Sequence, residues 1–469
     1  MLFNSIHFLL FFPAVAATYY LLPFRIRWIF LLLASYYFYM NWEPVYALLL
    51  MFSTAVTFVC SIFIGRAQVR KRKKFLLFIS IGSNLAVLGF FKYFNFLAEN
   101  ITKLFEMAGI DFYVPLSSFL LPVGISFYIF QAIGYSIDVY RGTIPPQKHF
   151  GKYALFVSFF PQLVAGPIER TANLLPQFEK KHKFVFINFW RGLRLMIFGF
   201  FMKLVVADRL ALYVDAVYNN DENHSAYSIV LATVFFSFQI YCDFSGYSSI
   251  AIGAARVMGF KLMTNFRRPY FSRSISQFWR RWHISLSTWF KDYVYISLGG
   301  NRVGAGRMYI NLLVTFAISG LWHGANWTFL IWGILNGLYL VLENVKSRLR
   351  PARYQHWSIQ CLQIFCVFVL INVSWIFFRS SSIEHAVRIF NKIVMAEGKL
   401  FVPPDPEIMI YSVMAITIVV AMEFVYEFIY QRRLVRNSIA VQNMLMLFLF
   451  FCILLFGVFD GGQFIYFQF

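Results

Sequence analysis

Charged residues are scarce in this chain. They make up 13% of its 469 residues, whereas about 25% is usual for a globular protein. Hydrophobic residues make up 59% and aromatic residues 21%. This composition excludes intrinsic disorder, and it leaves too little polar surface for several soluble domains. We therefore expect a polytopic integral membrane protein.

Signatures of the common soluble enzymes are absent as well. The chain has no Walker A loop, no GxSxG elbow, no HExxH motif and no dinucleotide-binding fingerprint in a strand–helix context. Its five cysteines form no CxxC pair, so they indicate neither a zinc ribbon nor a disulfide framework. We expect no metal site and no bound cofactor.

Acidic residues are few: 21 Asp and Glu stand against 42 Lys and Arg, which leaves a net charge of +21. In a soluble protein this excess would suggest nucleic-acid binding. In a chain this apolar, it indicates basic residues at cytoplasmic membrane ends, where they set the orientation and contact anionic lipid. We expect contact with a lipid bilayer and no nucleic acid.

The basic clusters also orient the chain. They place the loop 66–74 inside, together with the later basic stretches 346–353 and 432–436. The N-terminus, the net acidic segment 98–112 and Asp460 then fall outside.

Uncharged runs of about 20 residues, the length that crosses a bilayer, recur along the sequence. We expect an all-α fold with about ten or eleven transmembrane helices, plus re-entrant and amphipathic helices. The segment 159–170 is the re-entrant candidate, because it is apolar but short and broken by two prolines. No linker or fixed-period repeat interrupts the chain, so we expect one membrane-embedded domain over residues 1–469. The main runs are 1–24, 28–42, 44–65, 75–91, 113–137, 225–242, 308–342, 354–378, 408–422 and 437–459. Within 113–137, the Pro122-Val123-Gly124 stretch predicts a kink.

The run 308–342 is too long for one straight span. Its 35 residues would form a helix of about 52 Å, whereas the hydrocarbon core is about 30 Å thick. The run must therefore bend or hold two helices, with Gly320 and Gly324 as candidate breaks. His323 lies in its middle, and Asn326 would lie one helical turn away. A neutral imidazole there suits a general base, and the alternative is a packed histidine bonded to another helix.

A second histidine, His283, lies among apolar residues at helical spacing. The spacing continues from 275 to 293, and Arg280 and Arg281 break the apolar face. The pattern predicts an amphipathic helix at an interface or lining a groove. The arginine pair would suit a phosphorylated ligand or lipid head groups, because guanidinium groups bind phosphate well. An interfacial anchor with an incidental His283 is the alternative.

Asp243 lies at the end of an apolar run, so its carboxylate is expected close to the hydrophobic core of the membrane. Partnering a basic side chain or capping a helix is the alternative to a binding role. Six further histidines are expected at the surface or at interfaces: His7, His149, His182, His224, His356 and His385.

Several of these residues lie in stretches that resemble the membrane-bound O-acyltransferase (MBOAT) family. The likeness is strongest to its bacterial branch of alginate and peptidoglycan O-acetyltransferases. The stretches are LPVGISFYIFQAIGYSIDVYRG (121–142), FFPQLVAGPIER (159–170), DFSGYSSIAIGAARVMGF (243–260), NFRRPYFSRSISQFWRRWHISLSTWFKDYVYISLGGNR (265–302), LWHGANWTFLIWG (321–333) and, as a weaker match, SWIFFR (374–379).

The resemblance implies a funnel-like helical protein of the bacterial inner membrane, with a motif core at 113–345 and peripheral helices at 1–112 and 346–469. It implies that His323 is the catalytic base and that His283 is also functional. Acetyl-CoA or a related cytosolic acyl carrier would supply the acetyl group. An extracytoplasmic SGNH-type partner would then use it to modify a polysaccharide hydroxyl. Residues expected at the donor or substrate are Trp279, Arg280, Arg281, Trp322, Asn326 and Asp243.

Other functions stay open at this point. Within the family, a teichoic acid D-alanyl transferase would take its acyl group from a carrier protein. In a different class, a transporter or channel also has broken spans with buried polar residues, although most transporters have repeat-related halves. Haem held by His283 and His323 is a third alternative.

Overall fold

The computed structural model describes residues 1–469 apart from 165, 350–355, 430–437, 460–463 and 466–469. Every regular element among the described residues is helical. The chain forms two compact units, residues 1–192 with 254–263 and residues 193–253 with 264–469. Part of the basic loop 346–353, the basic turn 432–436 and Asp460 lie outside the described residues, so the orientation they predict stays a prediction.

Seven helices in the described part of the chain are long and apolar enough to cross a bilayer. The expectation of about ten or eleven also counted shorter runs, such as the apolar helix Ile6–Leu21. An all-helical polytopic membrane fold is confirmed. The seven are Tyr46–Arg66, Arg70–Met107, Ala226–Val257, Trp327–Ser347, Trp357–Arg379, Glu407–Ile429 and Ile439–Phe456.

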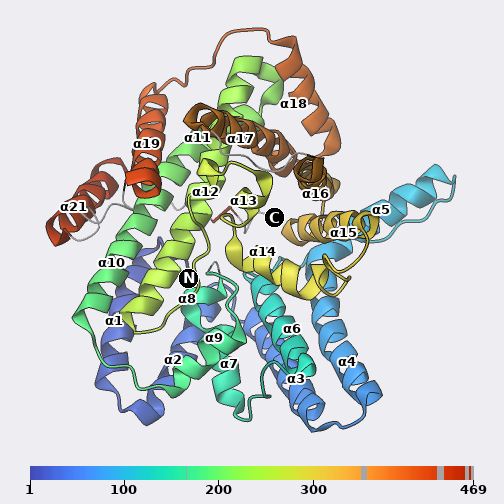
Figure 1. The fold of residues 1–469 in the computed structure, drawn as a ribbon, viewed down its shortest axis with the longest axis vertical. Helices are drawn as coiled ribbons and strands as arrows, with labels where there is room; N and C mark the ends of the chain where they lie inside the picture. Colours follow the sequence, from blue (N-terminus) through green and yellow to red (C-terminus); the bar gives the residue numbers. More distant parts are fainter. Residues whose placement is uncertain (165, 350–355, 430–437, 460–463, 466–469) are drawn as a thin grey trace. The chain divides into compact units, whose positions relative to one another are not determined.

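The first unit contains the helices of the N-terminal part of the chain, drawn in blue to green in Figure 1. They are α1 Ile6–Leu21, α2 Phe24–Met40, α3 Tyr46–Arg66, α4 Arg70–Leu88, α5 Phe94–Met107, α6 Ile125–Arg141, α7 Phe150–Ser158, α8 Phe160–Leu163, α9 Thr171–Leu174 and the start of α10 Phe186–Phe200. The four-residue α8 lies in the predicted re-entrant segment and is far too short to span a bilayer.

Helices α3, α4 and α6 lie side by side within this unit (Figure 1). Buried polar side chains bond between them. The Ser53 hydroxyl donates to Asn84 Oδ1 at 2.5 Å, and the hydroxyl oxygens of Ser80 and Ser136 are 2.7 Å apart. Bonds of this kind join membrane helices, because an apolar surrounding offers polar groups no other partner.

The predicted span 113–137 begins later than expected, because α6 starts only at Ile125. Gly124 is its N-cap, with φ at +74°, and a Cβ there would lie 2.8 Å from the carbonyl oxygen of Leu163. Only glycine combines this left-handed backbone with such a close approach. Pro122 and Gly124 therefore mark the start of the helix, and the predicted kink inside a span is wrong.

The second unit contains the rest of α10 and the later helices. They are α11 Asp208–Tyr218, α12 Ala226–Val257, which ends in the first unit, α13 Ile275–Trp279, α14 Ile284–Phe290, α15 Ala305–His323, α16 Trp327–Leu349, α17 Trp357–Arg379, α18 Ile383–Met395, α19 Glu407–Phe424 and α21 Ile439–Phe456. Among the described residues, short π-helical segments extend four helices, at Gly89–Tyr93, Phe201–Ala207, Lys291–Tyr295 and Val425–Ile429.

The long run 308–342 is two helices, as its length requires. Helix α15 ends at His323 and α16 begins at Trp327, and the two pack tightly against each other. Their contact depends on two glycines. A Cβ on Gly320 would lie 2.2 Å from the carbonyl oxygen of Phe329, and a Cβ on Gly333 would lie 2.3 Å from that of Phe316. Small residues let membrane helices approach this closely, and the hairpin fixes where His323 lies.

Candidate active site

His323 is the last residue of α15, and the backbone turns away directly after it. Gly324 is extended, and a Cβ there would lie 2.1 Å from the ring of Phe329. Two residues later, Asn326 joins the turn to its surroundings. Its Oδ1 accepts the amide proton of Thr328 at 3.0 Å, which caps α16, and its Nδ2 donates to the carbonyl of Ser381 at 2.8 Å. Asn326 therefore holds the turn in place rather than lying one helical turn from His323.

Aromatic rings surround the His323 imidazole, which is 4% exposed. Its ring centroid lies 5.0 Å from those of Trp322 and Trp332 and 5.4 Å from that of Phe378. The planes meet at 81°, 84° and 70°, so each contact is close to T-shaped. These rings exclude water and restrict the rotation of the imidazole.

His283 lies at a break that periodicity alone does not predict. The expected amphipathic helix over 275–293 is divided into α13 and α14, and the prediction of one continuous helix is wrong. His283 is the N-cap of α14 with φ at +39°, a left-handed conformation that costs a non-glycine residue about 1–3 kcal/mol. Because it faces inward and is 1% exposed, His283 is a buried residue and not an interfacial anchor.

Asn265 holds the His283 ring and determines which nitrogen carries the proton. Asn265 Oδ1 accepts the backbone N–H of Ser285 at 3.2 Å, so the oxygen of this amide faces His283. The same oxygen lies 3.1 Å from His283 Nδ1. Since an amide oxygen can only accept, Nδ1 carries the proton and Nε2 is the basic nitrogen of the neutral ring. The Asn265 Nδ2 donates to Ser248 on α12 at 3.0 Å, which fixes the amide in turn.

The two histidines flank one indole. The ring centroid of Trp322 lies 6.1 Å from that of His283 and 5.0 Å from that of His323. The ring of Phe244 lies 4.4 Å from His283, between centroids. Burial lowers the pKa of His283 well below its ordinary value of 6.5, so this imidazole is neutral at physiological pH. The structure thus brings together the two histidines that the sequence singled out.

The two arginines before His283 have different surroundings. The Arg281 guanidinium donates to Glu427 at 2.8 Å and to the carbonyl of Arg268, while Arg268 Nε donates to the other oxygen of Glu427 at 2.7 Å. Arg280 is exposed, and its Nε donates to the carbonyl of Ser276 on its own helix. Arg281 is therefore held in an ion pair, and Arg280 is the better placed of the two to contact a ligand.

Trp279 and Asp243 have different contacts. The Trp279 indole contacts that of Trp332 at 5.8 Å between centroids and so extends the aromatic cluster at His323. Asp243 on α12 is buried, and its carboxylate bonds to Lys203 at 2.7 Å and accepts the backbone N–H of Ile465 at 2.6 Å. These contacts match the alternative role of Asp243, a partner for a basic side chain.

Sequence reasoning missed three residues of the site: Asn265, Trp332 and Phe378. All three lie inside or beside the motif stretches, but nothing in their spacing distinguishes them from packing residues. No group of three or more metal-ligating side chains occurs in the described part of the chain.

This chain is similar in sequence to known proteins. A family model described as "MBOAT, membrane-bound O-acyltransferase family" matches residues 147–383, which include both histidines. The "Probable alginate O-acetylase AlgI" of Pseudomonas putida is 40% identical over 395 residues, which cover 83% of this chain and 79% of the relative. This chain belongs to the membrane-bound O-acyltransferase family. As an MBOAT protein it is an acyltransferase, which leaves the transporter alternative without support.

Two further relatives indicate the range of related MBOAT proteins. The peptidoglycan O-acetyltransferase of Helicobacter pylori is 36% identical over 79% of this chain and 74% of its own length. The teichoic acid D-alanyltransferase of Streptococcus thermophilus is 29% identical, over 55% of this chain and 68% of its own length. The O-acetylating relatives are thus more similar and match over a longer stretch.

Proposed function

We propose that this protein moves an acetyl group from a cytosolic acyl thioester, acetyl-CoA or a related carrier, across the bacterial inner membrane for O-acetylation of an extracytoplasmic polysaccharide. The observation that carries the proposal is the pair of buried histidines on either side of Trp322 in an MBOAT chain. The higher identity to the alginate and peptidoglycan enzymes supports acetyl over D-alanyl as the acyl group.

His323 is the proposed base. The attacking hydroxyl is weakly nucleophilic at neutral pH, and a positioned base that takes its proton contributes about 10²–10⁴-fold. His283 would assist from the other side of Trp322, through Nε2, because Nδ1 is directed at Asn265. Arg280 is the proposed contact for the charged part of the donor.

Two indole N–H groups are candidates to stabilise the oxyanion that forms in the transition state. Trp279 Nε1 and Trp332 Nε1 are buried and have no hydrogen-bond acceptor among the described residues. Burying a donor without a hydrogen-bond partner costs about 1–3 kcal/mol, and a bond to the developing oxyanion would recover this free energy. Such donors are most effective in dry sites, where their dipoles are already oriented.

An assay with labelled acetyl-CoA tests the donor, the role of His323 and the acceptor together. Membranes containing the protein would be incubated with labelled acetyl-CoA, with a candidate SGNH-type partner and with alginate or peptidoglycan. We expect labelled polysaccharide, and a loss of about 10²–10⁴-fold for His323→Ala. His7→Ala, which removes an exposed histidine, is the matched control. Full labelling by His323→Ala protein that inserts normally into the membrane would disprove the base assignment. Labelling only from a D-alanyl carrier protein would show that this carrier, and not acetyl-CoA, is the donor.

A further inference from the structure

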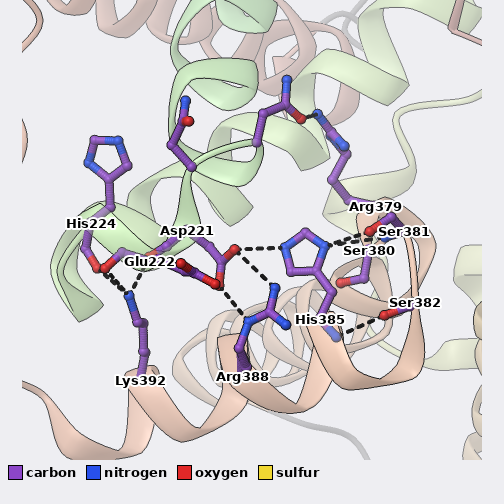
Figure 2. Close-up of polar contacts among 12 residues, drawn as sticks. Asp221, Glu222, His224, Arg379, Ser380, Ser381, Ser382, His385, Arg388 and Lys392 are labelled. Atoms are coloured by element: carbon purple, nitrogen blue, oxygen red, sulfur yellow. Dashed lines mark hydrogen bonds and ion pairs between the residues drawn. The ribbon is translucent and has the colours of Figure 1, made fainter.

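A second group of polar side chains lies where α17 passes into α18 and meets the turn after α11 (Figure 2). Its centre is formed by Ser381, His385 and Asp221. His385 was expected at the surface or an interface, yet it is 7% exposed, and Asp221 is 5% exposed. Ser381, in contrast, is exposed. An accessible hydroxyl is therefore joined to a buried imidazole and a buried carboxylate.

The contact between Ser381 and His385 fixes the imidazole tautomer. The backbone N–H of Ser381 donates to His385 Nδ1 at 3.3 Å, so Nδ1 carries no proton in the neutral ring. The Ser381 hydroxyl lies 3.1 Å from the same nitrogen and donates to it. Burial lowers the pKa of His385, which keeps the imidazole neutral and able to accept a proton.

The other nitrogen of the ring faces Asp221. In this tautomer Nε2 carries the proton, and it lies 3.6 Å from Asp221 Oδ1 (Figure 2). This separation is too long for a hydrogen bond, so the carboxylate acts on the ring through its charge. Arg388 donates to both carboxylate oxygens of Asp221, at 3.3 and 3.4 Å, and so holds the carboxylate in place. The order hydroxyl, imidazole, carboxylate is that of a serine hydrolase triad, with the two ring nitrogens exchanged.

A purely capping role for His385 would not require a hydroxyl, an imidazole and a carboxylate in this order. The N-cap of α18 is Ser382, whose hydroxyl accepts the backbone N–H of His385 at 3.1 Å. The backbone N–H of Ser381, one residue before the N-cap, donates back to His385 Nδ1, an arrangement that is similar to a capping box. Capping needs neither the hydroxyl of Ser381 nor the carboxylate of Asp221, and these two groups make the arrangement chemically useful.

Ser381 is also joined to the turn that follows His323. Its carbonyl accepts the Asn326 side-chain N–H at 2.8 Å, and Phe378, three residues earlier, lies against the His323 ring. The three residues from His323 to Asn326 span at most about 11 Å. Ser381 is therefore connected through Asn326 to the turn that follows His323.

We propose that Ser381, His385 and Asp221 form a second nucleophilic site, at which Ser381 carries the acyl group transiently between the donor and the final acceptor. This inference rests on the proposed function for its donor, an acyl thioester, and it describes a second route in which His385, in place of His323, takes the proton of the attacking hydroxyl. In the first step the Ser381 oxygen attacks the thioester carbonyl, and its proton passes to His385 Nδ1. The carbon–sulfur bond breaks, the thiolate takes that proton, and Ser381 is left as an acetyl ester.

The second step reverses the roles. An acceptor hydroxyl attacks the ester carbonyl of acetyl-Ser381 and gives its proton to His385 Nδ1. The bond between the carbonyl carbon and the Ser381 oxygen breaks, and that oxygen takes the proton back. No oxidant or further reactant is needed. Asp221 acts as a positioning residue that orients the imidazole and stabilises its protonated form.

Trapping the acyl group on the purified full-length protein tests this site. The protein in detergent would be incubated separately with p-nitrophenyl acetate and with acetyl-CoA, quenched in acid, digested and examined by mass spectrometry. We expect one acetyl group on the peptide that contains Ser381. His385→Gln is expected to lower the rate of ester formation about 100-fold, and Asp221→Asn by a smaller factor. Ser380→Ala is the matched control, because its buried hydroxyl donates to the Ile376 carbonyl.

Each outcome decides between the two proposals. Acetyl-Ser381 from the aryl ester but not from acetyl-CoA would support the second site and reject acetyl-CoA as donor. Transfer from acetyl-CoA to polysaccharide at an unchanged rate in Ser381→Ala would reject the second site and leave the proposed function intact. An acetyl group found only on other residues, or on Ser381 at the same rate in His385→Gln, would also reject it. Ser381→Thr retains a hydroxyl and is expected to carry the label, which separates loss of the nucleophile from loss of folding.

Discussion

The His323 imidazole packs against the Trp332 indole with the ring centroids 5.0 Å apart and the planes at 84°. Trp332 is 1% exposed and also contacts Trp279, Trp375 and Phe378. The indole thus links the proposed base to the aromatic cluster. Its position makes Trp332 the most informative aromatic residue to change.

Trp332→Phe tests the indole N–H as an oxyanion donor. The phenyl ring keeps an aromatic contact with His323 but removes Nε1–H, so we expect acetyl transfer to fall about 10²-fold. The loss of unfolding free energy should stay near 1 kcal/mol, the value of one aromatic contact. Trp375→Phe is the control, because Trp375 stacks on Trp332 without a direct ring contact to His323 among the described contacts. Equal loss of transfer in both variants would mean that the N–H of Trp332 has no special role.

Asn265→Asp tests the protonation state of His283. A carboxylate 3.1 Å from Nδ1 stabilises the imidazolium and raises the pKa of His283, which burial otherwise lowers. Protonation of Nε2 at pH 7 removes its lone pair, so transfer should fall about tenfold there and recover as the pH is raised. Rate against pH is the measurement, with the exposed Asn301→Asp as control. An unchanged pH profile would show that the Nε2 lone pair of His283 is not required.

Gly320→Ala tests the contact between α15 and α16. The new methyl group meets the Phe329 carbonyl carbon and oxygen, so the helices must separate, at a cost of about 1–3 kcal/mol. Gly306→Ala lies on the same helix with nothing within 4 Å of its Cβ and should not destabilise the protein. Thermal unfolding in detergent compares the two. If both variants unfold at the wild-type temperature, the hairpin tolerates a wider spacing than the glycines indicate.

Arg281→Ala and Arg280→Ala should separate stability from donor binding. Arg281 loses its bonds to Glu427 and to the Arg268 carbonyl, so we expect a loss of about 1–3 kcal/mol of unfolding free energy. The exposed Arg280 loses only a bond within its own helix, so stability should be retained while KM for the donor rises. Unfolding temperature and KM are measured on both variants. A normal KM for Arg280→Ala would remove the role that we propose for it.

The stability of the protein should fall with decreasing pH partly because of His385. Its pKa is lowered from 6.5, first by burial, while Asp221 opposes the shift and the charges of Arg388 and Arg379 add to it. The unfolded chain therefore binds a proton that the folded chain does not, and stability is lost as pH falls below about 6.5. His385→Gln, which does not titrate, should show a smaller slope of unfolding temperature against pH between about 7 and 5. A slope equal to that of the wild-type protein would mean that His385 titrates normally in the fold.

The sequence alone determined the class of the fold and singled out His323 and His283 as candidate site residues. Few charges and repeated apolar runs require membrane helices, since only internally bonded backbone is stable in lipid. The length of the run 308–342 required a break near Gly324, and the break is there. His323 stood out because an ionisable group in an uncharged run is costly. These properties are local, so the order of residues is enough to reveal them.

The tertiary structure decided what surrounds those residues. Periodicity predicted one helix through His283, but the left-handed residue at the break depends on Asn265, eighteen positions earlier in the chain. The same holds for His385, which lies in a polar stretch of the sequence but is buried in the fold, close to Asp221. Contacts between distant segments set burial, tautomer and charge pairing. The sequence pattern does not show burial, tautomer or charge pairing, because each of these depends on which elements meet after folding.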